Sequence, residues 1–176
     1  MKGRHNTMKR SVVIPLILSL AYFVMAQTSQ VVVKTPSMEP NIHINDSLTV
    51  DEAYYSSNPV QRFDIVLLKH PSQNFKVVAR IIALGGETIS IKENKVFINN
   101  KAIKEPYKIR PCAEEKEKAA SVCEDFGPFK VPDGEYFYLA DDRGGSLDSR
   151  LLTPHTVNSA QILGKVIRIV SKSNAA

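Results

Sequence analysis

Short apolar runs separated by turn residues recur from Val31 onward, and this pattern constrains the fold more than any other feature. The runs are rich in Val, Ile and Phe, and Gly85-Gly86, Glu93-Asn94 and Asn99-Asn100 interrupt them. Because such runs with turn signals between them are typical of strands, the sequence predicts a mostly β domain without internal repeats. The strands are expected over residues 31–34, 47–51, 63–69, 75–84, 88–91, 95–98, 136–140 and 164–170, and a single helix over 114–121.

The N-terminus carries a basic stretch followed by an apolar run. Residues 1–10 include two lysines and two arginines, and residues 11–26 are mostly apolar. As a helix, this run would be about 24 Å long, and residues 27–30 could complete a span of the hydrocarbon core, which is about 30 Å thick. Positive charge stays in the cytoplasm. We therefore expect a cytoplasmic tail at 1–10, a transmembrane signal anchor at 11–30 and an exported domain at 31–176.

The same segment also fits a secretory signal that is removed. Val24 and Ala26 are small residues at the spacing found before a cleavage site. The mature chain would then be a secreted, β-rich binding protein. Both interpretations place the domain outside the cytoplasm.

Two cysteines, Cys112 and Cys123, lie in a polar, turn-rich stretch that we interpret as an insertion at residues 104–129. An exported chain meets an oxidising environment, so we expect a disulfide that closes this insertion. Two free thiols are the alternative. No second Cys or His pair accompanies the cysteines, so their spacing does not resemble a zinc site. No metal and no organic cofactor is expected.

The net charge of +5 is mild, and part of it comes from the first ten residues. The basic residues form no stripe interleaved with aromatic side chains, and the sequence has no nucleic-acid-binding motif. We therefore expect no nucleic-acid partner.

Three segments carry motifs that occur together in one protease family. They are TPSMEP at residues 35–40, ARIIALGGE at 79–87 and VPDGEYFYLADDRGGSLDSR at 131–150. In this order they resemble the S-M-x-P, K-R-x-I-G-L-P-G-D and G-D-N-R-x-x-S-x-D-S-R boxes of bacterial type I signal peptidases. RFDIVLLKHP at 62–71 resembles a further box of that family. The resemblance implies a serine endopeptidase of the bacterial inner membrane, with a single span and the catalytic domain on the outer side. Its implied partners are the signal peptides of exported preproteins and membrane lipid, which we expect near Met38, Pro40 and Ile42.

The resemblance also assigns roles to particular residues. Ser37 falls on the nucleophile and Ala79 on the lysine that acts as its base. A serine hydroxyl needs an adjacent base, and a lysine serves only where its surroundings lower its pKa from about 10.4 toward neutrality. An alanine side chain accepts no proton. Ser146 falls on the serine that orients the lysine, and Thr35 lies near the position whose hydroxyl contributes to the oxyanion hole. Ion pairs are expected to brace the site, Asp148 with Arg150 and Asp141 with Arg143.

The missing lysine leaves several interpretations open. Another residue could supply the base, and the candidates near the motifs are Lys34, His43, His70 and Lys76. Lys76 lies three residues before Ala79, and so on the opposite face of a strand. Otherwise the chain is a catalytically silent homologue that binds signal peptides or partner proteins, or an engineered inactive variant.

Overall fold

The computed structural model describes residues 27–112 and 123–172 of the chain. Most of the segment predicted as an anchor, and the helix predicted at 114–121, therefore lie outside the described residues. Strand β1 begins at Thr28, among the last residues of the range 11–30 expected for the anchor. No helix in the described part is long and apolar enough to cross a membrane.

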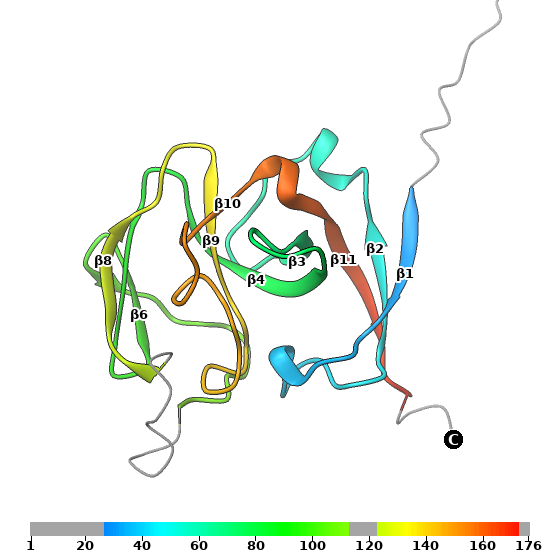
Figure 1. Ribbon diagram of the computed structural model, residues 1–176, viewed down its shortest axis with the longest axis horizontal. Helices are drawn as coiled ribbons and strands as arrows, with labels where there is room; N and C mark the ends of the chain where they lie inside the picture. The colour runs from blue at the N-terminus through cyan, green and yellow to red at the C-terminus, as the bar shows by residue number, and fades with distance from the viewer. Residues whose placement is uncertain (1–26, 113–122, 173–176) are drawn as a thin grey trace, which may run out of the picture.

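The described residues form two antiparallel sheets, with β6 and β8 of the smaller sheet on one side of the molecule and β1, β2 and β11 on the other (Figure 1). The larger sheet has the order β1-β2-β11-β3-β4-β9-β10, and the smaller has the order β7-β6-β5-β8. The strands of the larger sheet are β1 (Thr28–Val32), β2 (Ser47–Asp51), β3 (Ile65–Lys69), β4 (Lys76–Leu84), β9 (Glu135–Leu139), β10 (Val157–Asn158) and β11 (Ile162–Val170). Those of the smaller sheet are β5 (Thr88–Lys92), β6 (Lys95–Ile98), β7 (Lys101–Ala102) and β8 (Phe126–Lys130). Short 3₁₀ helices are η1 (Pro36–Met38), η2 (Tyr54–Ser56) and η4 (Ser159–Gln161).

The mostly β fold predicted from the sequence is confirmed, and each predicted strand range overlaps an observed strand. Glu93 and Asn94 make the turn between β5 and β6, with φ values of 47° and 61°, as a tight hairpin requires. One part of the predicted insertion differs, because its last residues form β8. Phe126 and Phe129 of that strand lie 5.2 and 6.3 Å from Phe137, measured between ring centroids. Their packing against this core explains a strand in a segment that is otherwise polar.

Apolar cores lie on both faces of β3, because successive side chains of a strand point to opposite faces. Leu67 packs on one face in a cluster that includes Met38. Val66 and Leu68 pack on the other face in a cluster that includes Ala79. A third core, which includes Ile89 and Phe137, lies between the small sheet and β9.

Strand β4 has one edge that is only partly covered. It pairs with β3 from Lys76 to Arg80, but with β9 only from Arg80 to Leu84. On the β9 side, residues 76–79 have no strand partner within the described part of the chain. Such an edge offers free backbone N–H and C=O groups to another extended chain.

Candidate active site

The turn that carries Ser37 is η1, which lies between β1 and β2. Pro36 begins this turn, where its fixed φ suits a first helical position. Met38 is 1% exposed and packs into the core, so it anchors the turn. Thr35 Oγ1 lies 3.3 Å from Ser37 Oγ. The two hydroxyls are therefore neighbours on a turn held by a buried side chain.

Of the three residues expected near lipid, two have side chains buried in the domain. Met38 is 1% exposed and Ile42 is 0% exposed, and both belong to the cluster that contains Leu48 and Val50. They point inward because that face of the sheet needs apolar side chains to cover it. Pro40 is partly exposed.

A pocket of about 210 Å³ brings the three motif segments together. Ser37 reaches it from η1, Ala79 from β4 and Ser146 from the loop that follows β9. Ala79 is 3% exposed and Ser146 is 8% exposed, so both lie in the buried part of the wall. The rest of the wall is largely apolar and includes Pro36, Phe75, Val77, Val78, Tyr138, Ala140 and Leu147.

The described residues that line this pocket include no lysine and no arginine. Of the alternative bases considered from the sequence, His70 lines the pocket. Lys34 and Lys76 line a neighbouring hollow that Ser37 also borders, but both are exposed, whereas a lysine becomes a base only when it is desolvated. His43 is exposed and lines neither hollow.

His70 is 2% exposed and follows strand β3. It lies four residues beyond Val66, the register partner of Ala79, which is about 13 Å along the strand. Its Nδ1 accepts a hydrogen bond from the Ser72 N–H at 3.2 Å, which puts the ring proton on Nε2. Burial lowers the pKa of His70 from its usual 6.5, so the ring is neutral at neutral pH. A neutral ring with its proton on Nε2 donates there rather than accepts, so in this arrangement it is no base for Ser37.

Tyr138 is a pocket residue that the sequence did not point to. It is 1% exposed, and it packs in the same cluster as Ala79. Burial, with a smaller effect from the Asp148 carboxylate, raises the pKa of Tyr138, so its hydroxyl stays protonated. Neither this hydroxyl nor His70 Nε2 has a hydrogen-bond partner among the described residues. No motif marks Tyr138, because a core aromatic residue in a strand has the same pattern.

The predicted pair of Asp148 and Arg150 is present and buried. Arg150 donates from Nη2 to Asp148 Oδ2 at 2.8 Å and from Nε to Oδ1 at 2.9 Å. Asp148 Oδ2 also accepts from the Ala140 N–H at 3.2 Å. These bonds tie the loop that carries Ser146 to the end of β9.

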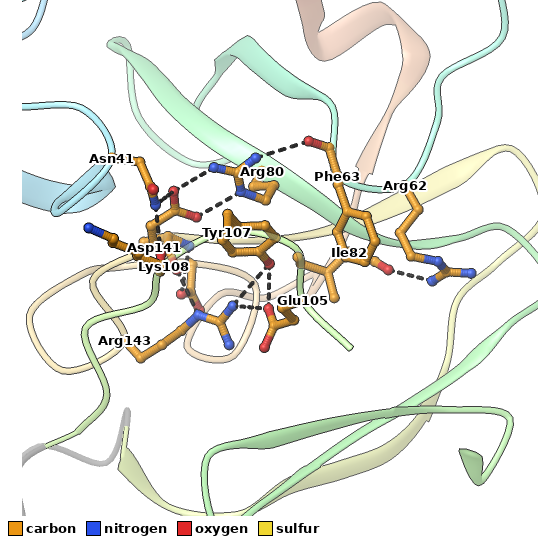
Figure 2. Close-up of polar contacts among 12 residues, drawn as sticks. Asn41, Arg62, Phe63, Arg80, Ile82, Glu105, Tyr107, Lys108, Asp141 and Arg143 are labelled. Atoms are coloured by element: carbon orange, nitrogen blue, oxygen red, sulfur yellow. Dashed lines mark hydrogen bonds and ion pairs between the residues drawn. The ribbon is translucent and has the colours of Figure 1, made fainter. Parts of the chain in front are cut away.

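The predicted pair of Asp141 with Arg143 is wrong. Asp141 instead binds Arg80, which donates from Nε to Oδ1 at 2.8 Å and from Nη2 to Oδ2 at 2.6 Å (Figure 2). The register explains this, since Arg80 lies opposite Leu139, two residues before Asp141. Arg143 binds the carboxylate of Glu105.

Arg80 has further partners on the face of β4 away from Ala79. Its Nη1 donates to the Phe63 carbonyl at 3.1 Å, and its guanidinium lies 3.7 Å from the centre of the Tyr107 ring (Figure 2). Arg80 therefore has a structural role, although it directly follows the position assigned to the base.

The chain is similar to known signal peptidases. The family model described as "Signal peptidase, peptidase S26" matches residues 5–171. Signal peptidase I of Bacillus licheniformis is 36% identical over 118 residues, which cover 67% of this chain and 63% of that protein. Signal peptidase I T of Bacillus subtilis (strain 168) is 36% identical over 118 residues, which cover 67% of this chain and 61% of that protein. The chain thus spans less than two thirds of these curated relatives. A solved structure of a signal peptidase I from Enterococcus faecalis V583 is 29% identical, with a TM-score of 0.51, and covers 62% of this chain and 97% of that chain.

Proposed function

Because the chain belongs to the signal peptidase (peptidase S26) family, we propose that it is by descent a serine endopeptidase that removes signal peptides from exported preproteins. The observation that carries this proposal is the meeting of Ser37, Ala79 and Ser146 at one pocket. These residues come from three separate segments, and each holds the position that its motif assigns to the catalytic unit.

The chemistry begins at Ser37. Its Oγ attacks the carbonyl carbon of the scissile peptide bond, and its proton passes to a base. The carbonyl oxygen becomes an oxyanion, for which the Ser37 N–H and the Thr35 hydroxyl are the proposed donors. The base then gives the proton to the leaving amine, and water hydrolyses the acyl-enzyme. Thr35 Oγ1 already lies 3.3 Å from Ser37 Oγ, which suits this role.

The described residues of this site supply no base like the expected lysine. Ala79 holds its position, and the other described residues that line the pocket carry no amine. We propose that the chain as written cleaves very slowly, because the oxyanion donors alone leave only a small residue of catalysis. The same observation favours a second function, in which the chain binds signal peptides or partner proteins without cutting them.

The proposed substrate site is the free edge of β4 at residues 76–79, next to Ser37. An extended peptide can add there as a strand and form backbone hydrogen bonds. Ser37 and the buried side chain of Ala79 then face the scissile bond. We expect small side chains on the peptide close to that bond.

Placement in the membrane is proposed from the sequence alone. The apolar run at residues 11–26 and the basic tail before it suit a single-pass anchor of the inner membrane, with the domain on the outer side. Lipid would then lie close to the site.

Cleavage of a purified preprotein with an Ala-x-Ala site tests the proposal. The chain as written, Ala79→Lys and the double variant Ser37→Ala with Ala79→Lys are incubated with it, and mass spectrometry identifies the new N-terminus. We expect Ala79→Lys to cut after the second alanine and the double variant to leave the preprotein intact. Intact preprotein with all three, together with signal-peptide binding, supports the second function. Cleavage that persists without Ser37 contradicts both.

A further inference from the structure

Residues 105–112, which we call the strap, contact all three motif segments although they belong to none. The Asn41 amide donates to the Lys108 carbonyl at 2.6 Å, which ties the strap to the turn after Ser37. Tyr107 covers the Arg80 guanidinium on β4, and Glu105 binds Arg143 (Figure 2). The sequence predicted this stretch to be part of a polar insertion, but in the structure it connects the three motif segments.

Arg110 makes the most direct of these connections. Its Nη2 donates to Glu39 Oε2 at 2.5 Å, and its Nη1 donates to Asp142 Oδ2 at 3.1 Å. Glu39 lies two residues after Ser37, and Asp142 lies four residues before Ser146. One side chain therefore bridges the turn that carries the nucleophile and the loop that carries its proposed partner.

The backbone of Arg110 is fixed to the same loop. Its N–H donates to the Asp141 carbonyl at 2.9 Å, and its carbonyl accepts from the Arg143 N–H at 2.9 Å. Two residues later, Cys112 joins Cys123 in a disulfide, and its Sγ lies 3.4 Å from the Arg143 carbonyl oxygen. These contacts thus fix the backbone of Arg110 relative to the loop that carries Ser146.

The two bridged segments also touch each other beside the nucleophile. The Asp142 N–H donates to the Ser37 carbonyl at 3.0 Å. A shift of the loop relative to the turn would therefore move the Ser37 backbone. A misplacement of about 1 Å in a catalytic group can cost on the order of a hundredfold in rate.

Arg110 is nevertheless a poor candidate for a purely structural role. Its side chain is 49% exposed, and exposed ion pairs add little to global stability because solvent screens them. Its guanidinium fork suits two carboxylates at once, which a lysine ammonium cannot bind with the same geometry.

We propose that Arg110 is a positioning residue, which sets the separation of Ser37 from Ser146 by holding the carboxylates of Glu39 and Asp142. The catalytic part of this proposal rests on the proposed function. The bridge that Arg110 makes between Glu39 and Asp142 can be tested without measuring activity. Arg110→Ala should loosen both segments while the rest of the domain stays as stable as before.

Hydrogen exchange of the chain as written is the first test. We expect the amides of residues 37–42 and 141–146 to exchange at least about tenfold faster in Arg110→Ala. The matched control is Arg168→Ala, since Arg168 is exposed on β11 and takes part in no ion pair within residues 27–112 and 123–172. The control should leave these amides unchanged. Unchanged exchange in Arg110→Ala, or faster exchange throughout the domain, overturns the proposal.

Kinetics of the Ala79→Lys background are the second test. Adding Arg110→Ala should lower kcat at least about tenfold with KM within about twofold, Arg110→Lys should be intermediate, and Arg168→Ala should have no effect. Equal kcat values for Arg110→Ala and Arg168→Ala overturn the positioning role. Inactivity of Ala79→Lys itself counts against the proposed function instead, and hydrogen exchange then decides on the bridge.

Discussion

Replacing Asp141 by alanine should strongly destabilise the domain, because Asp141 is one partner of a buried ion pair. The side chains of Asp141 and Arg80 are 0% and 7% exposed, and two charge-assisted hydrogen bonds of 2.8 and 2.6 Å join them. Asn41 adds a third bond to the carboxylate, at 2.8 Å. Without the carboxylate, the Arg80 guanidinium would remain buried with its charge uncompensated.

The expected cost follows from that buried charge. Removing one partner of a buried ion pair costs about 3–5 kcal/mol, because the remaining charge keeps its desolvation penalty. For a domain of this size each kcal/mol lowers Tm by roughly 2–4 °C, so we expect a drop of roughly 10 °C. The Phe63 carbonyl and the Tyr107 ring still contact Arg80, which favours the lower end of the range.

Urea unfolding followed by circular dichroism measures this cost, and the chain has no tryptophan to serve as a fluorescent probe. Asp133→Ala is the matched control, because Asp133 is exposed. Replacing both partners, Arg80→Met with Asp141→Leu, should recover part of the loss, since no unpaired charge remains. A cost below about 1 kcal/mol for Asp141→Ala would refute the reasoning, as would a double variant no more stable than the single one.

Three further predictions concern the loop, the turn and the pocket. Reducing the disulfide of Cys112 and Cys123, which are 11 residues apart, should lower the free energy of unfolding by about 2–3 kcal/mol. Equal urea midpoints with and without reductant would contradict this. In the Ala79→Lys background, Thr35→Val should lower kcat about a hundredfold without moving the urea midpoint; an unchanged kcat would remove Thr35 from the oxyanion hole. Because burial lowers the pKa of His70 below its usual 6.5, His70 binds a proton more readily in the unfolded chain than in the folded chain. Stability should therefore fall as the pH drops below about 6.5, by at most about 1.4 kcal/mol per unit, and His70→Gln should remove that part of the slope. Parallel pH curves for the two proteins would rule this out.

The sequence predicted the strands well because their signals are local. The run that became β4 is β-branched and ends at Gly85-Gly86, and the hairpin after it turns at Glu93 and Asn94, where both residues have positive φ. The end of the predicted insertion was different, because β8 is a strand through its pairing with β5, which is distant in sequence, and through its packing against Phe137.

The candidate site, like the strands, could be predicted from the sequence only in part. Motifs located Ser37, Ala79 and Ser146, which line one pocket. The partner of Asp141 could not be found this way, since Arg80 reaches it through the register of β4 and β9.

Other residues around the site carry no sequence signal. Tyr138 looks like any core aromatic in a strand, and Arg110 like any exposed arginine in a polar stretch. What makes each of them notable is the pocket or the pair of carboxylates beside it, which only the folded chain brings into place.

The most direct test of the account is the rate of preprotein cleavage by Ala79→Lys relative to Ala79→Met, measured in a single turnover. Both side chains fill the space beside Ser37 to a similar extent, but only lysine can accept the serine proton. We predict that the lysine variant cleaves about a thousandfold faster or more, since removing the base from a nucleophile–base unit costs at least that much. Equal rates for the two variants would contradict the account, because the position of Ala79 would then not be that of the base.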